Sequence, residues 1–244
     1  MKIFYETLAE WWPLISPVAD YEVEAHHYTR LIETRAPDAR TLLELGSGGG
    51  HNAFYLKQRF TLTLSDLSEQ MLAVSAKLNP DCEHVRGDMR DLDLKRRFDV
   101  VFVHDAIDYM TTEADLEAAI RTAHRHLGPN GLALFVPDHV SERFEPGSEC
   151  GGSDAADGRA VRFLEWTPSI TPGATTGTTY YSFLVRGSDG SVKSFHERHV
   201  FGLFSESTWV RLLEGCGFEV EVSDDDIAGD HTPRLSFFAR RRGA

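Results

Sequence analysis

Apolar and polar positions between residues 41 and 136 repeat with two periods, and these periods predict strands that alternate with helices. Short apolar runs predict strands over 41–45, 61–65, 82–86, 98–103 and 132–136. Helical spacing of apolar residues fills the intervals over 51–60, 68–78 and 113–127, and Gly128-Pro129-Asn130-Gly131 predicts a turn before the last strand. This alternation indicates a doubly wound α/β fold, in which helices cover both faces of a mostly parallel sheet.

The two ends of the chain add helices and two more strands. Residues 5–12 and 21–35 have helical spacing, interrupted by Pro13 and Pro17, and should cover the sheet. Ser205 is placed to cap a helix over 206–216. After it, 218–222 and 235–240 should form a hairpin that completes a seven-stranded sheet.

Residues 139–204 break the alternation and predict an inserted lid. The stretch 145–158 is rich in Gly, Ser, Asp and Glu, which predicts a mobile segment. Strand-like runs follow over 160–166, 178–186 and 192–204, the last two joined by the turn Gly187-Ser188-Asp189-Gly190. Because the insert leaves the sheet after the fifth strand, where ligands bind in such folds, we expect an antiparallel β lid over the active site.

These patterns divide a single domain of 244 residues into four parts. They are cover helices over 1–36, a nucleotide-binding core over 37–138, the lid over 139–204, and a closing helix and strand pair over 205–244.

The formal net charge of −13 would repel a polyanion, which argues against a nucleic acid partner. No apolar run approaches the roughly 20 residues of a membrane span, and the three cysteines lie far apart. We therefore expect a cytoplasmic protein that does not bind membranes.

A glycine-rich turn follows the first predicted strand and is the strongest chemical signal in the chain. Its glycines alternate as Glu44-x-Gly46-x-Gly48-x-Gly50, and glycine allows positive φ and close approach of a ligand to the main chain. The dinucleotide fingerprint requires a third glycine where His51 stands, and the Gly-Lys-Ser/Thr of a P-loop is absent. Neither of those nucleotide-binding motifs therefore fits.

Acidic residues at the ends of the next strands extend this signal. Asp66 ends the second strand about 20 residues after the turn, where a carboxylate accepts hydrogen bonds from ribose hydroxyls. Gly87-Asp88-Met89 follows the third strand. In this order the motifs resemble those of class I S-adenosylmethionine (SAM)-dependent methyltransferases, whose fold is Rossmann-like. The resemblance implies SAM as cofactor, with Asp88 facing the adenine amino group. It implies cofactor contacts from Glu44, Gly46, Ser47, Gly48, Gly50, Asp66, Leu67, Met71, Asp88, Met89 and His104.

Candidate catalytic residues lie after the fourth strand and in the lid. Within His104-Asp105-Ala106-Ile107-Asp108-Tyr109-Met110, the first residues should lie nearest the transferred methyl group, and Tyr109 should turn toward the acceptor. His199 shares one face of its strand with Phe195, Glu197 and Phe201, and its imidazole could orient or deprotonate an acceptor. We expect catalytic roles for His104, Tyr109 and His199. The alternatives are a buried structural histidine at 199 and acidic residues that merely favour a helix start.

The layout is similar to bacterial N,N-dimethyltransferases that act on nucleotide-linked amino sugars. The closest local matches are Gly87-Asp88-Met89-Arg90-Asp91 and His199-Val200-Phe201-Gly202-Leu203-Phe204, whereas His104-Asp105 replaces small residues. Asp105 and Asp138-His139 offer metal ligands, but the Asp-Asn pair of catechol-type enzymes is missing, so no metal is predicted. The resemblance implies a monomeric or homodimeric enzyme that methylates nitrogen or oxygen of a small molecule. The alternative is a SAM-binding regulatory protein without turnover.

Overall fold

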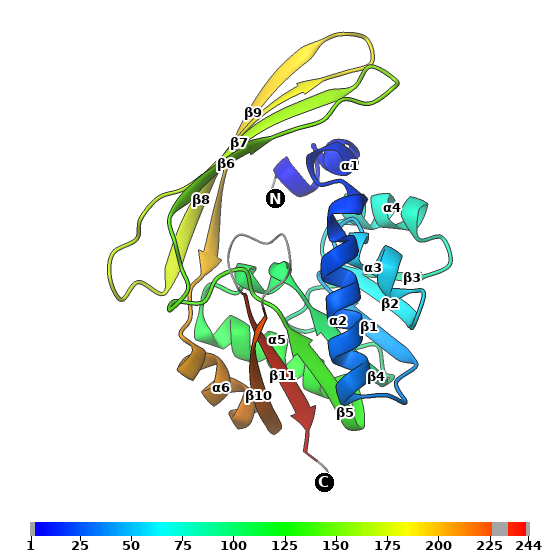
Figure 1. Cartoon of the computed structure of the whole chain (residues 1–244), viewed down its shortest axis with the longest axis vertical. Coiled ribbons are helices and arrows are strands. Elements are labelled where there is room, and N and C mark those ends of the chain that lie inside the picture. The colour runs from blue at the N-terminus through cyan, green and yellow to red at the C-terminus, as the bar shows by residue number, and fades with distance from the viewer. Residues whose placement is uncertain (1–2, 226–233, 243–244) are drawn as a thin grey trace.

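The computed structural model describes residues 3–225 and 234–242, and its core is a seven-stranded sheet (Figure 1). The strands are β1 (Thr41–Leu45), β2 (Thr61–Asp66), β3 (Glu83–Arg86), β4 (Phe98–Val103), β5 (Leu127–Phe135), β10 (Phe218–Asp225) and β11 (Arg234–Arg241). Their order in the sheet is β10-β11-β5-β4-β1-β2-β3, and β11 runs in the direction opposite to the other six strands. The predicted α/β class and the closing hairpin are thus confirmed.

Helices cover both faces of this sheet because each presents an apolar face to it. On one face, α2 (Glu22–Arg35) and α3 (His51–Leu56) pack through Tyr28, Ile32 and Leu56. On the other, α5 (Glu113–Arg125) and α6 (Glu206–Gly215) bury Ile120 and Trp209. The helix α4 (Glu69–Leu78) flanks β2 and β3. The predicted cap is confirmed at Ser205, whose side chain accepts a hydrogen bond from the Thr208 amide.

The fifth strand begins earlier than the sequence predicts. Residues 128–131 were expected to form a turn before a strand over 132–136, but they belong to β5. The pairing with β4 shifts between Phe98 and Val100, where the partner changes from Leu127 to Leu132. The extra residues form a bulge, and the positive φ of 61° at Asn130 is a conformation that also occurs in tight turns.

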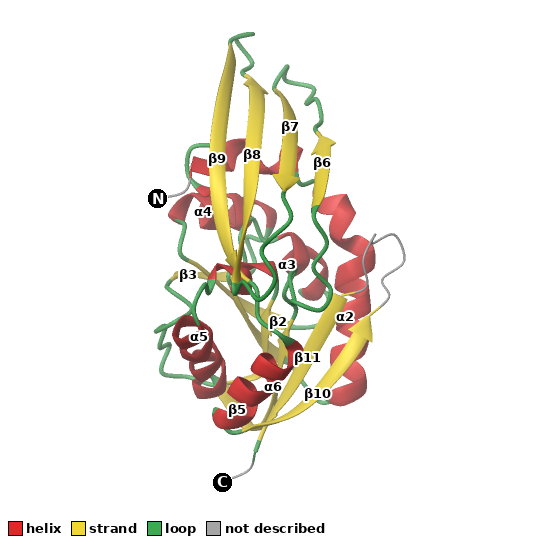
Figure 2. Ribbon diagram, turned by 90° about the vertical axis from the view of Figure 1, so that its left-hand side faces the viewer, coloured by secondary structure: helices red, strands yellow, loops and turns green. Residues whose placement is uncertain are grey.

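The insert forms a second sheet of four antiparallel strands that stands above the core (Figure 2). The strands are β6 (Gly147–Gly151), β7 (Ala160–Thr167), β8 (Thr176–Arg186) and β9 (Val192–Gly202), in that order. We call this sheet the lid. The predicted strands are confirmed as β7 to β9, but the stretch expected to be mobile holds β6. That strand pairs through its backbone while almost all of its side chains stay exposed, so no apolar alternation marks it.

The N-terminal segment lies between the lid and the core (Figure 1). A single helix was predicted over 5–12, but the structure has short turns: η1 (Ile3–Tyr5), η2 (Ala9–Trp11), α1 (Trp12–Ile15) and η3 (Val18–Tyr21). Phe4 and Leu8 pack against Val161, Phe183 and Val185 of the lid, so packing overrides local helix propensity here. Among the described residues, no helix has the length and apolar character needed to cross a membrane.

Candidate active site

The glycines of the turn after β1 differ in what surrounds them. Gly46, Gly48 and Gly50 have φ values of +77°, +52° and +74°, which side-chain-bearing residues rarely adopt. A Cβ at Gly46 would lie 2.3 Å from Cβ of Ala106, and one at Gly50 would lie 2.2 Å from Oγ of Ser75. Those two positions are required by packing within the protein. At Gly48 the nearest atom, Cε of Met71, is 3.7 Å away, so this glycine leaves room for a ligand.

Two buried polar groups flank the turn without hydrogen-bond partners. Oε2 of Glu44 and Oγ of Ser47 have no partner among the described residues, although both side chains are buried. Burial raises the pKa of Glu44 to about 8. Met71 lies beside Gly48 and Met89 beside Gly46, and their contacts with the cofactor stay a prediction. An orphaned carboxyl oxygen next to open main chain fits a ligand that carries an ammonium group, as SAM does.

Asp66 at the end of β2 holds the turn in place. Its Oδ2 accepts a hydrogen bond from the Gly48 amide at 2.8 Å, and its Oδ1 accepts one from the Ser68 amide at 2.8 Å. Each carboxylate oxygen has a second lone pair, so ribose hydroxyls can still bind. Burial raises the pKa of Asp66. The neighbouring Leu67 is 61% exposed, which is unusual for a large apolar residue and suits contact with a ligand.

Asp88, the expected partner of the adenine amino group, forms a salt bridge with Arg90. Nη2 of Arg90 lies 2.6 Å from Asp88 Oδ2, and the same guanidinium reaches Asp115 at 3.0 Å. The hydrogen bonds from Arg90 lower the pKa of Asp88. The carboxylate is therefore ionised and fixed, and its contact with adenine stays a prediction.

His104 lies in a buried network of charges. Its Nδ1 is 2.8 Å from Asp105 Oδ1, and its Nε2 is 3.2 Å from Glu24 Oε1. Burial alone would lower the pKa of His104, but the two carboxylates raise it well above the ordinary value. Arg234 joins the network, with Nη1 3.0 Å from Asp105 and 2.8 Å from Asp138. Both ring nitrogens of His104 thus face carboxylates, which favours a charged, structural imidazole, and its predicted catalytic role stays a prediction.

Tyr109 and His199 meet where the carboxyl-terminal ends of the strands face the lid. The Tyr109 hydroxyl lies 2.8 Å from Nδ1 of His199 and 2.6 Å from the hydroxyl of Tyr5. On the far side of the imidazole, Nε2 of His199 is 3.2 Å from Oε2 of Glu197. The sequence analysis directs both Tyr109 and His199 to the acceptor, and the structure brings them into direct contact.

Glu197 extends this chain to the N-terminal segment. Its carboxylate accepts hydrogen bonds from the amides of Ile3 at 2.9 Å and Phe4 at 2.7 Å. The Tyr5 carbonyl accepts a hydrogen bond from Ser68 Oγ at 2.6 Å, beside the predicted ribose site. The role of Glu197 escaped the sequence analysis, although its place two residues before His199 on the same strand face was a usable signal.

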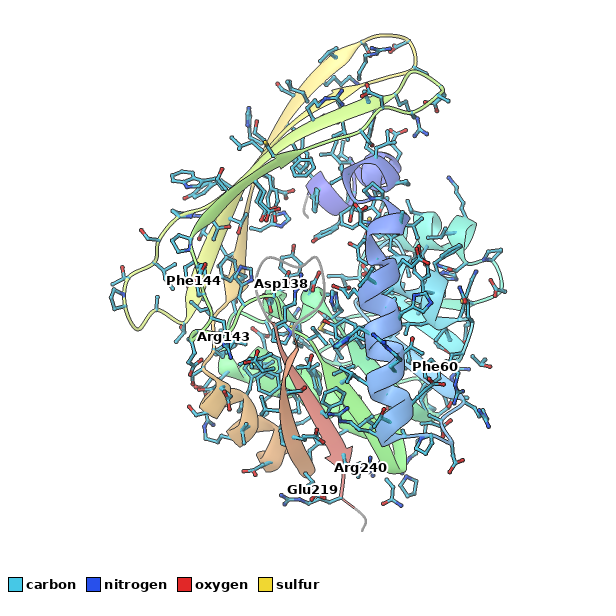
Figure 3. All side chains as sticks on the ribbon, viewed as in Figure 1. Phe60, Asp138, Arg143, Phe144, Glu219 and Arg240 are labelled. Carbon is cyan, nitrogen blue, oxygen red and sulfur yellow. The ribbon has the colours of Figure 1, made fainter. Side chains whose placement is uncertain are left out.

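Asp108 and His139 form a second pair at the same edge. Oδ2 of Asp108 is 2.8 Å from Nδ1 of His139, and the imidazole stacks on Phe201 of the lid with ring centroids 3.9 Å apart. Ligand atoms of Asp108, Asp138 and His139 all lie within 4.8 Å of one another, which is close enough to hold a metal ion. This set contains Asp108 where the sequence had suggested Asp105. Asp138 lies at the end of the sheet nearest the lid (Figure 3).

Comparison with known proteins identifies the family to which this chain belongs. A family described as "Methyltransferase domain" matches residues 42–131. The dTDP-3-amino-3,6-dideoxy-alpha-D-glucopyranose N,N-dimethyltransferase of Streptomyces fradiae is 31% identical over 212 residues, which cover 86% of this chain and 82% of the relative. The chain belongs to the methyltransferase family.

Two further matches define the chemistry of the family. The chain is 25% identical to an amino pentose methyltransferase from Micromonospora echinaspora that was solved with SAM bound, with a TM-score of 0.75 and 91% of each chain covered. It is also 30% identical over 202 residues to the cypemycin N-terminal methyltransferase of a Streptomyces species, covering 80% of this chain and 79% of that one. The protein is a SAM-dependent methyltransferase, as the sequence motifs predicted.

Proposed function

We propose that this enzyme methylates an amine nitrogen of a small molecule. The observation that carries the proposal is the chain of contacts from Tyr5 through Tyr109 and His199 to Glu197, which ends in a carboxylate. An alkyl ammonium must lose a proton before its nitrogen can attack, and a chain that ends in a carboxylate can take that proton. The names of relatives support an amine, since one acts on an amino sugar and another on a peptide N-terminus.

The residues around the glycine turn would hold the cofactor. Glu44 would bind its ammonium group, Gly48 would admit it to the main chain, Asp66 would bind the ribose and Asp88 the adenine amino group. When bound, SAM supplies a sulfonium methyl group, which forms a bond to the acceptor nitrogen as its bond to sulfur breaks and the electron pair stays on sulfur. The protein must therefore place the nitrogen in line and remove one proton.

A single proton assignment satisfies the contacts of this chain. The Tyr5 hydroxyl donates to the Tyr109 oxygen, the Tyr109 hydroxyl donates to Nδ1 of His199, and Nε2–H of His199 points to Glu197. Burial raises the pKa of both Tyr5 and Tyr109, so both phenols stay neutral near pH 7. The remaining lone pairs of their oxygens can then accept the N–H groups of the acceptor and orient its nitrogen.

A methyl-transfer screen tests this function. The enzyme is incubated with SAM labelled with tritium in the methyl group and with matched amines, phenols and carboxylic acids. We expect label to enter amines, and we expect it in molecules of the size of a sugar rather than in nucleic acids, because the chain carries a net charge of −13. Label that entered only phenols or carboxylic acids would show that the acceptor atom is assigned wrongly.

A further inference from the structure

The N-terminal residues 3–12, which we call the strap, contact both the lid and the cofactor side of the core (Figure 1). At the lid, two backbone amides of the strap donate hydrogen bonds to the carboxylate of Glu197. At the core, the carbonyl of Tyr5 accepts a hydrogen bond from Oγ of Ser68 at 2.6 Å. The strap therefore connects the predicted acceptor site with the predicted cofactor site.

Ser68 links the strap to the carboxylate that is expected to bind the ribose. Its amide donates a hydrogen bond to Oδ1 of Asp66 at 2.8 Å, while its hydroxyl donates to the Tyr5 carbonyl. The hydroxyl of Tyr5 lies in turn 2.6 Å from that of Tyr109. A ligand that fixes Asp66 and the residues after it would thus fix the backbone of Tyr5 and place its phenol in the acceptor site.

A second contact explains a glycine that the cofactor motif does not require. Gly49 lies between two motif glycines but does not share their positive φ, so its backbone would accept other residues. A Cβ at this position, however, would lie 2.4 Å from Cδ1 and 2.5 Å from Nε1 of Trp12. Glycine is needed here because the strap packs directly on the glycine turn.

The closed strap leaves polar groups at the turn without partners. Nε1 of Trp12 is buried and has no hydrogen-bond partner in the part of the chain that the structure describes, and the same holds for Oε2 of Glu44 and Oγ of Ser47. Buried unpaired polar groups cost free energy, and a ligand that pairs with them removes that cost. SAM carries an amino group and a carboxylate that can form such pairs, so its binding favours the closed strap.

The strap has little regular structure of its own. Its turns η1 and η2 are three residues each, which is too short for a helix that is stable without outside contacts. Its side chains Phe4 and Leu8 are buried against the lid. A segment that is held by contacts with its surroundings opens readily when some of these contacts are lost.

We propose that the strap closes on bound cofactor and that Ser68 transmits this closure to the acceptor site. Ser68 is then a positioning residue, which acts by fixing Tyr5 and, through Tyr5, by orienting Tyr109. The inference rests on the proposed function for the place of the acceptor. Its link to the cofactor rests only on the family to which the chain belongs.

Hydrogen exchange with S-adenosylhomocysteine (SAH), the product that remains when SAM has lost its methyl group, tests the inference without an acceptor. Exchange of the backbone amides of residues 3–12 is followed by mass spectrometry, without SAH and with SAH at about 100 times the dissociation constant of each protein. In the parent enzyme we expect SAH to slow this exchange by about tenfold, a typical coupling between two sites. In Ser68→Ala the slowing should fall below about twofold, and Ser68→Thr, which keeps the hydroxyl, should restore it.

Ser205→Ala is the matched control for the loss of a helix cap. Ser205 caps α6 as Ser68 caps α4, and its other hydrogen bonds go to Ser207 and Thr208. The substitution therefore costs a similar amount of helix stability at a different place. SAH should slow the exchange of residues 3–12 in this variant as much as in the parent enzyme.

Gly49→Ala opens the strap by another route and decides the question if Ser68→Ala folds poorly or does not bind SAH. Its Cβ would meet Trp12, so residues 3–12 should exchange about fivefold faster than in the parent enzyme even without SAH. Unchanged exchange in Gly49→Ala, or equal slowing by SAH in Ser68→Ala and the parent enzyme, would overturn the inference.

The absence of any slowing in the parent enzyme would overturn the inference as well. Amine methylation would stand in each of these cases, because the methyl-transfer screen tests it separately. A screen that labelled no amine would refute the proposed function and leave the closure of the strap on the cofactor intact.

Discussion

The contact between Tyr109 and His199 makes a quantitative prediction for Tyr109→Phe. The substitution keeps the ring and deletes the hydroxyl, which lies 2.6 Å from Tyr5 and 2.8 Å from His199. A hydrogen bond contributes about 0.5–1.5 kcal/mol net, so the loss of two amounts to about 1–3 kcal/mol. If both bonds hold the acceptor site in its reactive form, kcat/KM for the acceptor should fall by roughly 5- to 150-fold.

The assay must separate catalysis from cofactor binding and from folding. We expect the SAM dissociation constant from titration calorimetry to stay within about twofold of the parent value, because the deleted hydroxyl contacts Tyr5 and His199, whereas the predicted cofactor contacts come from Asp66 and the glycine turn. His199→Ala should give a similar loss, and the double variant should be little worse than either single variant, because both act through one chain. Thermal unfolding measures how much each substitution destabilises the folded protein.

Tyr180→Phe is the matched control for this experiment. Tyr180 lies on the outer face of the lid and is 43% exposed, so the same loss of a hydroxyl should leave acceptor turnover unchanged. Normal turnover in Tyr109→Phe and His199→Ala would refute the catalytic role of the chain, although the lid could remain as structure. Equal losses in Tyr109→Phe and Tyr180→Phe would mean that the effect is not specific to the site.

Three further predictions concern the cofactor side. Asp66→Ala should weaken SAM binding by about 1.5–3 kcal/mol in calorimetry, and unchanged affinity would show that the ribose site is misplaced. Gly48→Val should weaken SAM binding more than it lowers the melting temperature, whereas Gly50→Ala should mainly lower the melting temperature, because its Cβ would meet Ser75. Burial raises the pKa of Glu44 to about 8, so the folded state retains a proton that the unfolded chain loses near pH 4.3, and stability without cofactor should fall as pH rises from about 4 to about 8. Glu44→Gln should flatten this pH dependence in denaturant titrations, and an unchanged slope would count against the assignment.

The sequence predicted the parts of the fold that depend on apolar periodicity. The alternation of β1 to β5 with helices was clear because each element buries a regular face. Prediction from apolar periodicity failed for β6, which pairs by backbone alone. It also failed for residues 5–12, where contacts with the lid replace a regular helix. The Gly, Pro and Asn residues of the bulge in β5 predict a turn, because bulges and turns use the same local conformation.

The candidate site was predictable where residues follow a motif and hidden where they meet across long distances. Asp66 and the glycines lie at motif positions, so the cofactor side could be inferred locally. The bond from Glu197 to the amide of Ile3 joins residues 194 apart, and the pair of Asp108 and His139 joins residues 31 apart. Periodicity gives the face on which such residues lie but not their partners, so Glu197 and Arg234 emerged only from the structure.

The central claim is that the enzyme methylates nitrogen, and the position of a labelled methyl group tests it most directly. The enzyme is incubated with SAM labelled with ¹³C in the methyl group and with cyclohexane-1,3-diamine, and the isolated product is studied by NMR. The account predicts a labelled methyl carbon bonded to nitrogen, formed much more slowly by Tyr109→Phe. Enzyme that binds SAM but leaves this and every other amine unlabelled, or that places the label on oxygen or carbon, would contradict it.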